Sequence, residues 1–199
     1  MTSHLRTPVF FILLLLSIGT TALARPQTPE GLNHALSKSL ADPAFNSTYT
    51  RNGCFARAHW IANELHVAGL APVKAFIRPM DPAQKIQFTD PKLQTYRWVF
   101  HVAAAHLERV SNTEERVWIL DPLISTTALT VDEWLASFRN QNPDVELKVS
   151  IENAEVYSDR QADNDEFQAL GAPFGPEAID FIRDVMEQLT YWESLDSLN

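Results

Sequence analysis

Apolar residues at helical spacing mark the segment after Asn52 as the clearest helix of the chain. Residues three and four positions apart share one face of a helix, and a stripe of this kind packs against a core. Asn52 can cap the start, and Gly69 stands where a glycine usually follows a helix end. We therefore predict a helix from Gly53 to Ala68, with a buried face that carries Cys54, Ala58, Ile61, Ala62 and Leu65.

Two apolar runs rich in aromatic and β-branched residues predict central strands: TYRWVFHVAAAHLERV at 95–110 and ERVWILDP at 115–122. The polar residues SNTE between them are typical of a turn, so the two runs should form an antiparallel hairpin. A further strand is indicated at 72–78, where PVKAFIR alternates apolar and polar positions. The proline-punctuated segment 79–94 is long for a connection, and we expect a functional or mobile loop there.

Shorter patterns complete the expected architecture. Residues 32–40 predict a short helix, residues 131–140 a second, and residues 145–159 one further strand or two. Residues 175–192 predict a final amphipathic helix with an apolar face of Ala178, Phe181, Ile182, Val185, Met186 and Leu189. The predicted fold class is therefore α+β. An antiparallel sheet packs against the helix that bears the cysteine, and an amphipathic helix follows at the C-terminus.

The first 24 residues have the pattern of a secretory signal peptide. Arg6 precedes an apolar run that is short for a membrane span, and the small residues Ala22-Leu23-Ala24 form a cleavage site. Cleavage after Ala24 would leave 199 − 24 = 175 residues of a secreted or periplasmic protein. We expect a lead-in segment at 25–52 and a single catalytic domain at 53–199.

Composition excludes several classes of partner. Loss of Arg6 changes the formal net charge from −9 to −10, and an acidic surface disfavours nucleic acids and anionic membranes. With one cysteine the domain cannot form an internal disulfide. The chain has no CxxC or HxxxH pattern, so we expect no metal site and no cofactor. The oligomeric state is left open.

Cys54, the one cysteine, lies in the first turn of the predicted helix. A free cysteine is usually a small buried hydrophobe. At a helix N-terminus, however, the partial positive charge and unpaired N–H groups stabilise a thiolate and a neighbouring oxyanion. The position therefore suits a nucleophile, provided that a base lies nearby.

Strand parity selects the base among the five histidines that follow residue 24. His59 is on the same helix but about 140° around from Cys54. His101 and His106 lie on the predicted strand and point to opposite faces, because their numbers differ by an odd count. With the turn centred on residue 111 or 112, only His101 shares a face with Asp121. Taken singly, His101 could be a core residue and Asp121 the end of a strand; together with Cys54 they form a thiol–imidazole–carboxylate set.

Three motifs resemble the bacterial protein-glutaminase (protein-glutamine deamidase) family: GCFARAH at 53–59, WVFHVA at 98–103 and ILDP at 119–122. The resemblance covers about Gly53 to Pro122 and extends more distantly to the transglutaminase-like fold of thiol enzymes. It implies that Cys54 is the nucleophile, with His101 and Asp121 as its catalytic partners. Supporting or substrate-binding roles would fall to Gly53, Arg57 and Trp98. Arg57 could tie the helix to a carboxylate, and Trp98 could line the substrate slot, although both could equally be structural.

The resemblance implies hydrolysis of glutamine side chains in proteins or peptides to glutamate, with release of ammonia through a thioester. Two alternatives remain open at this stage. A transglutaminase or thiol protease would share the first attack, and a non-enzymatic exported module would retain only the fold. We expect accessible glutamine in protein or peptide substrates as the partner, with no nucleic acid and no membrane after signal cleavage.

Overall fold

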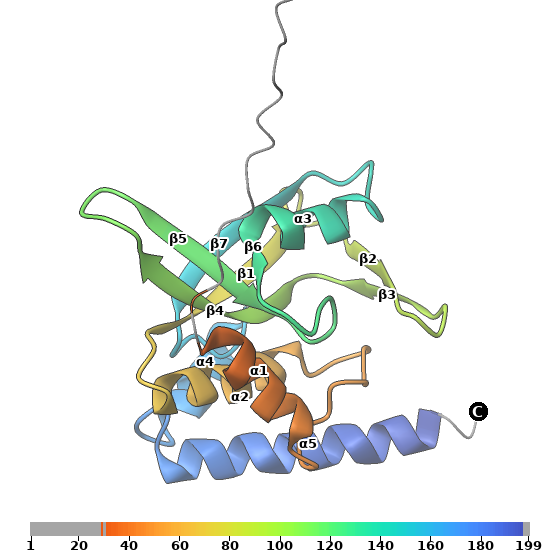
Figure 1. Cartoon of the computed structure of the whole chain (residues 1–199). Coiled ribbons are helices and arrows are strands. Elements are labelled where there is room, and N and C mark those ends of the chain that lie inside the picture. Colours follow the sequence, from red (N-terminus) through yellow and green to blue (C-terminus); the bar gives the residue numbers. More distant parts are fainter. Residues whose placement is uncertain (1–28, 30, 197–199) are drawn as a thin grey trace, which may run out of the picture.

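A five-stranded antiparallel sheet forms the centre of the molecule in the computed structural model, which describes residue 29 and residues 31–196 (Figure 1). The strand order is β6-β5-β4-β1-β7, and a separate two-stranded ribbon pairs β2 with β3. The strands are β1 (Pro72–Pro79), β2 (Ile86–Thr89), β3 (Thr95–Trp98), β4 (His101–Arg109), β5 (Glu115–Leu120), β6 (Leu129–Thr130) and β7 (Leu147–Asn153). The predicted signal peptide and its cleavage site lie outside the described residues.

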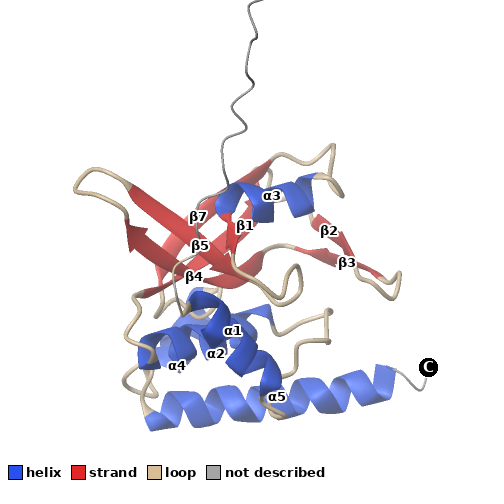
Figure 2. Cartoon of the chain, in the orientation of Figure 1, coloured by secondary structure: helices blue, strands red, loops and turns tan. Residues whose placement is uncertain are grey.

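Helices cover both faces of the sheet, most of them on one side (Figure 2). They are α1 (Leu32–Ala41), α2 (Cys54–Val67), α3 (Val131–Arg139), α4 (Gln161–Gln168) and α5 (Pro176–Asp196). Helix α2 packs on β4 and β1, α1 and α5 pack on α2, and α3 contacts β5 and β6. Within the described residues, no helix is both long and apolar enough to cross a membrane.

The alternation of β4 divides the core into two parts. Ala104 faces the main cluster, which includes residues of α1, α2 and α5. Ala103 and Ala105 face a second cluster with Trp134 and Phe138 of α3. Because successive side chains of a strand point to opposite faces, a residue number fixes the side on which its chemistry lies.

Helix α2 begins at Cys54, one residue later than a helix capped by Asn52 would begin. Asn52 was predicted to cap it, but Gly53 is the N-cap, in a left-handed conformation at φ 85°, and no side chain caps the helix. Asn52 instead accepts a hydrogen bond from the N–H of Gly53 through Oδ1, at 2.8 Å. At the other end Gly69 has φ 74°, as the sequence predicted for the residue after the helix.

The predicted hairpin is present, with a break that the sequence did not indicate. Ala104 faces Leu120 and Arg109 faces Glu115, so the turn is centred on residue 112, one of the two expected registers. The predicted strand at 95–110 is divided at Val99-Phe100 into β3 and β4. The loop predicted at 79–94 contains β2, which pairs with β3.

Other segments differ in detail from the prediction. The short helix at 32–40 is present as α1, and its buried residues Leu32 and Leu36 belong to the main core, so this part of the lead-in packs with the rest of the domain. Residues 145–159 contain one strand, β7. Helix α4 was not predicted. The final helix is α5, and the face predicted for it is buried at Ala178, Ile182, Met186 and Leu189 and partly buried at Phe181 and Val185.

Candidate active site

The fold brings together the three residues that the sequence selected. Cys54 is the first residue of α2 and is half-buried. His101 is the first residue of β4 and Asp121 directly follows β5; each is 2 % exposed. Since β4 and β5 are neighbours, and His101 and Asp121 both lie on the α3 face, the imidazole and the carboxylate meet at the end of the sheet.

Asp121 is held by three donors. Its Oδ2 lies 2.8 Å from Nε2 of His101 and accepts a second hydrogen bond from the indole N–H of Trp134 at 2.7 Å. Its Oδ1 accepts from the backbone N–H of Leu123 at 3.1 Å. Burial raises the pKa of this carboxyl, but the charge and hydrogen bond of His101, with the other donors, bring the pKa below its usual value. Asp121 is therefore an anion that fixes the imidazole through Nε2.

Aromatic rings fix the plane of the His101 imidazole. Trp98 stacks on it with ring centroids 5.1 Å apart and an interplanar angle of 20°. Phe138 and Trp134 of α3 lie at 5.4 and 6.1 Å. The other ring nitrogen, Nδ1, makes no hydrogen bond of normal geometry within residues 31–196. With Nε2 engaged by Asp121, Nδ1 is the atom available to the sulfur.

The thiol and the imidazole shift each other's proton affinity. Burial raises the pKa of Cys54, but the neighbouring imidazole of His101, the charge of Arg57 and the backbone N–H of Val102 together lower it below the ordinary value. Burial lowers the pKa of His101, but Asp121, with a smaller contribution from Cys54, raises it to about 9. The pair therefore favours a thiolate beside an imidazolium, the reactive form of a cysteine nucleophile.

Gly53 helps to set the position of the sulfur, because a glycine permits both the left-handed backbone and the close approach of Leu189. Its φ of 85° is strained for any residue with a side chain, and a Cβ built there would clash with the Leu189 side chain of α5. The start of α2 thus packs closely against the last helix. A larger residue at this position would strain the turn that carries Cys54 and push the Leu189 side chain aside.

Arg57 is buried, and within the described residues its hydrogen-bond partners are backbone carbonyls, which agrees with the structural one of its two expected roles. Its guanidinium donates to the carbonyls of Tyr49 at 2.9 Å and Asn52 at 3.2 Å. These bonds tie the segment before α2 to the first turn of the helix. The positive charge of Arg57 also contributes to the lowered pKa of Cys54.

Cys54 opens into a small pocket of about 220 Å³. Trp98 lies on its wall, as the sequence suggested, and the other lining residues are Thr50, Arg51, Asn52, Arg97, Val99 and Phe100. A larger groove of about 760 Å³ shares Arg51, Asn52, Val99 and Phe100 with it and continues along α4 and α5. The thiol therefore lies at the base of an opening that a side chain of a larger molecule can enter.

Sequence reasoning missed Trp134, although its spacing from Phe138 placed both on one face of a predicted helix. No sequence signal indicates that this face meets Asp121. Two other histidines have partners of their own: His106 hydrogen-bonds the carbonyl of Ala71, and His59 contacts Lys74. Among the residues that the structure describes, no three His, Cys, Asp or Glu side chains form a group that could hold a metal ion.

Comparison with solved structures agrees with this geometry at the level of the fold. The NMR structure of protein-glutaminase from Chryseobacterium proteolyticum aligns with a TM-score of 0.51 and 18% identity, over 66% of this chain and 72% of that one. A crystal structure of protein-glutaminase gives 0.51 and 18%, over 66% and 74%. A crystal structure of pro-protein-glutaminase gives 0.50 and 16%, over 76% and 64%. The predicted fold class, α+β with a transglutaminase-like core, is confirmed.

Sequence comparison adds the family. No curated protein matches the chain. The family model described as glutaminase matches residues 30–138, more than half of the chain. The match begins before the motifs in which we saw the resemblance and continues past them, so it includes α1 and nearly all of α3 as well as the candidate site. The chain therefore belongs to the glutaminase family.

Proposed function

We propose that this protein is a protein-glutamine deamidase, a cysteine-dependent amidohydrolase that converts glutamine side chains of proteins or peptides to glutamate. The observation that carries the proposal is the buried His101–Asp121 hydrogen bond of 2.8 Å beside a thiol whose pKa is lowered. Membership of the glutaminase family and the likeness to structures described as protein-glutaminase support the choice of substrate.

The first step is attack of the Cys54 thiolate on the γ-carboxamide carbon. The carbonyl oxygen becomes an oxyanion, and the unpaired N–H groups at the start of α2 can donate hydrogen bonds to it. No side chain caps these groups, because Gly53 is the N-cap. A glycine at the N-cap therefore permits close packing against Leu189 and also leaves the first N–H groups of α2 without a side-chain partner.

The second step releases ammonia. When the tetrahedral intermediate collapses, the C–N bond breaks and the imidazolium of His101 gives its proton to the departing nitrogen. The neutral His101 then takes a proton from water, whose oxygen attacks the thioester carbon. Collapse of the second intermediate expels the thiolate and leaves glutamate. Asp121 keeps the imidazole oriented and favours its charged form through both steps.

The shape of the opening is suited to a polypeptide. The pocket of about 220 Å³ at Cys54 has room for one side chain, and the groove of about 760 Å³ beside it has room for neighbouring residues of the same chain. Trp98 forms a wall of the smaller pocket. We further propose that residues 1–24 direct export and are removed, that residues 25–52 lead into a single catalytic domain at 53–199, and that the protein acts in the periplasm or outside the cell.

The test uses the native protein and an unfolded, glutamine-rich protein as substrate. We expect ammonia release matched, site by site, by the small mass gain of carboxamide conversion to carboxylic acid. Cys54→Ser should lower the rate by about 10³-fold or more, since the weakly acidic hydroxyl forms no comparable nucleophile.

Other outcomes would identify a different chemistry. Crosslinked substrate or amine incorporation would indicate a transglutaminase, and shorter fragments a thiol protease. No reaction with a wide range of unfolded proteins, and no difference between the native protein and Cys54→Ser, would leave a non-enzymatic module. Thermal unfolding of Cys54→Ser serves as the control, because the replacement changes a single atom of a half-buried side chain.

A further inference from the structure

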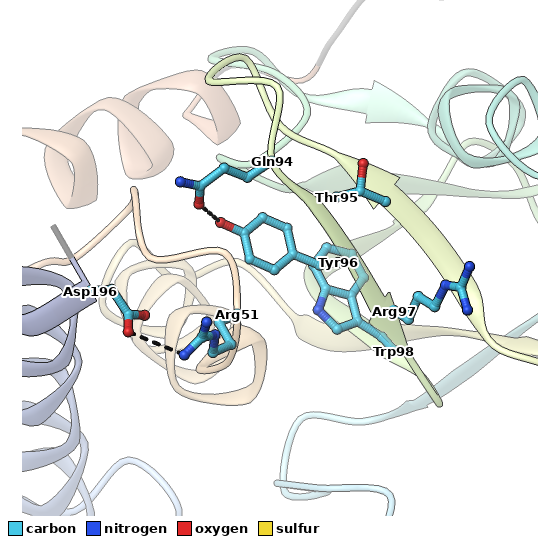
Figure 3. A pocket seen from close by; sticks show the side chains of 7 residues that line it. All are labelled: Arg51, Gln94, Thr95, Tyr96, Arg97, Trp98 and Asp196. Carbon is cyan, nitrogen blue, oxygen red and sulfur yellow. Dashed lines mark hydrogen bonds and ion pairs between the residues drawn. The ribbon is translucent and has the colours of Figure 1, made fainter. Parts of the chain in front are cut away.

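A second hollow adjoins the thiol pocket and has an aromatic wall (Figure 3). It has a volume of about 740 Å³ and is lined by Arg51, Gln94, Thr95, Tyr96, Arg97, Trp98 and Asp196. The rings of Tyr96 and Trp98 lie on the same side of β3, as residues two apart on a strand must, and Arg97 projects from the opposite side (Figure 3). Their planes are nearly parallel, at 9°, with centroids 6.4 Å apart.

This hollow is continuous with the candidate active site. Arg51, Arg97 and Trp98 line both the 740 Å³ hollow and the 220 Å³ pocket that contains Cys54. Trp98 also stacks on His101, so Tyr96, Trp98 and His101 form a ladder of rings that leads away from the thiol. From His101 to Tyr96 the ladder spans about three residues of extended chain. A polypeptide with its glutamine at Cys54 can therefore place a flanking residue against Tyr96.

The opposite side of the hollow presents a cation paired with an anion. Arg51 lies 3.1 Å from Asp196, and their side chains are 64 % and 40 % exposed. Opposite charges side by side give little net preference for an acidic or a basic ligand. The hydroxyl of Tyr96 donates to Gln94, which fixes the ring at the wall of the hollow, and Arg51 lies on the other side (Figure 3). A guanidinium and an aromatic ring that line the same hollow are suited to hold a further ring.

We propose that this hollow is a subsite for an aromatic side chain of the substrate, within about three residues of the target glutamine. The inference rests on the proposed function and adds to it a substrate class: polypeptides in which an accessible glutamine has a Phe, Tyr or Trp close by in sequence. Tyr96 is the specificity-determining residue, and Arg51 covers the opposite face of the bound ring.

The test is a set of blocked seven-residue peptides with one central glutamine. Phe occupies each flanking position in turn, and Ala occupies the rest. We expect kcat/KM for the best Phe peptide to exceed that of the all-Ala peptide by about threefold to tenfold. Tyr96→Ala and Tyr96→Leu should reduce this ratio to about one, and Tyr96→Phe should retain it. Tyr96→Leu keeps apolar bulk in the hairpin, in case Tyr96→Ala folds poorly.

A matched control is Tyr191→Ala, which removes the same side chain from an exposed position of α5 outside the hollow. It should leave kcat/KM for the Phe peptide, kcat/KM for the all-Ala peptide and their ratio unchanged. A native ratio of one at every position, or a preference that survives both Tyr96→Ala and Tyr96→Leu, would overturn the proposal.

Binding of the same peptides to Cys54→Ala separates this proposal from the deamidase assignment. Tighter binding of the Phe peptide that is lost on Tyr96→Leu, without any ammonia release by the native protein, would uphold the subsite and refute deamidation. Ammonia release at equal rates from the Phe and Ala peptides, with equal binding, would uphold deamidation and refute the subsite.

Discussion

Two buried histidines on opposite sides of the central sheet have opposite charge states. His101 is 2 % exposed and bonded to Asp121, and its pKa is raised to about 9. His59 is fully buried beside Lys74, and its pKa is lowered to about 3 by burial and then by the lysine. Burial alone disfavours the charged imidazole in both places. The neighbouring residue decides the outcome, which shows why buried histidine is not in itself a sign of catalysis.

The hydrogen bonds around His59 agree with its neutral form. One ring nitrogen, Nε2, lies 2.6 Å from the carbonyl of Pro173 and must donate to it. The other, Nδ1, accepts from the amine of Lys74 at 3.1 Å, and the same amine donates to the carbonyl of Val156 at 2.7 Å. Burial lowers the pKa of Lys74 to about 7. Both ring nitrogens of His59 have partners, and neither His59 nor Lys74 lines the pocket at Cys54, so this pair is structural.

The strongest test of the comparison between His101 and His59 replaces Asp121, the carboxylate that binds His101. Asp121→Asn keeps the shape of the side chain but cannot balance the imidazolium, so the pKa of His101 should fall. We expect kcat for ammonia release to drop by about 10²-fold to 10⁴-fold. Asp42→Asn, the same change at an exposed aspartate, should have no effect. A loss smaller than about tenfold would mean that Asp121 only ends a strand.

Removal of the imidazole itself should affect stability as well as activity. His101→Ala leaves a space among Trp98, Trp134 and Phe138 and a buried carboxylate without its cation. We expect the free energy of unfolding to decrease by about 3 to 5 kcal/mol, measured by chemical denaturation. His106→Ala, which loses only a hydrogen bond to a carbonyl, should cost about 1 to 2 kcal/mol. Equal losses for the two variants would show that the His101–Asp121 pair has no special energetic role.

The two groups should also give stability a pH dependence of opposite sign. Between its ordinary pKa of 6.5 and about 9, folded His101 holds a proton that the unfolded chain has lost, so stability falls as pH rises. Between about 7 and 10.5, folded Lys74 has lost a proton that the unfolded chain still holds, so stability rises. Each slope is at most about 1.4 kcal/mol per pH unit.

Denaturation from pH 6.5 to 9 in a Cys54→Ala background separates these slopes, because the thiol titrates in the same range with the opposite sign to His101. Adding Lys74→Met should leave only the contribution of His101, so that stability falls as pH rises. Adding Asp121→Asn should leave only the contribution of Lys74, so that stability rises with pH. If both double variants kept the slope of the parent, the assigned charge states would be wrong.

The smallest expected effect concerns a third histidine, in the last turn of α2. His66 is exposed and stacks on Phe174, with ring centroids 4.7 Å apart. His66→Ala should change the free energy of unfolding by less than about 0.5 kcal/mol and leave ammonia release unaltered. A large loss of activity would place a functional contact at the far end of α2.

The part of the site that the sequence could predict follows from local periodicity. Residues two apart on a strand share a face whatever the rest of the chain does, so parity was enough to separate His101 from His106. The contacts that depend on tertiary packing were out of reach. Trp134 of α3 meets Asp121 just after the end of β5. Arg57 binds carbonyls of a segment without regular structure, which no spacing rule describes.

The errors in the fold have similar causes. Strand β2 is four residues long and lies between proline-rich turns, so its pattern is too short to distinguish from a loop. The sequence QADNDEFQ of α4 has few apolar residues, and only Asn164 and Phe167 are buried. The break between β3 and β4 leaves Val99 exposed within an apolar run, where local hydrophobicity favours continuity. In each case the local pattern alone does not define the element.

The close contact between Gly53 and Leu189 affects the order in which the site is completed during synthesis. A ribosome releases α2 and the strands before α5. Because Leu189 lies against Gly53, this contact with the start of α2 can form only after α5 has emerged and docked. The turn that carries Cys54 would therefore lack one of its supports in a nascent chain that has not yet reached α5.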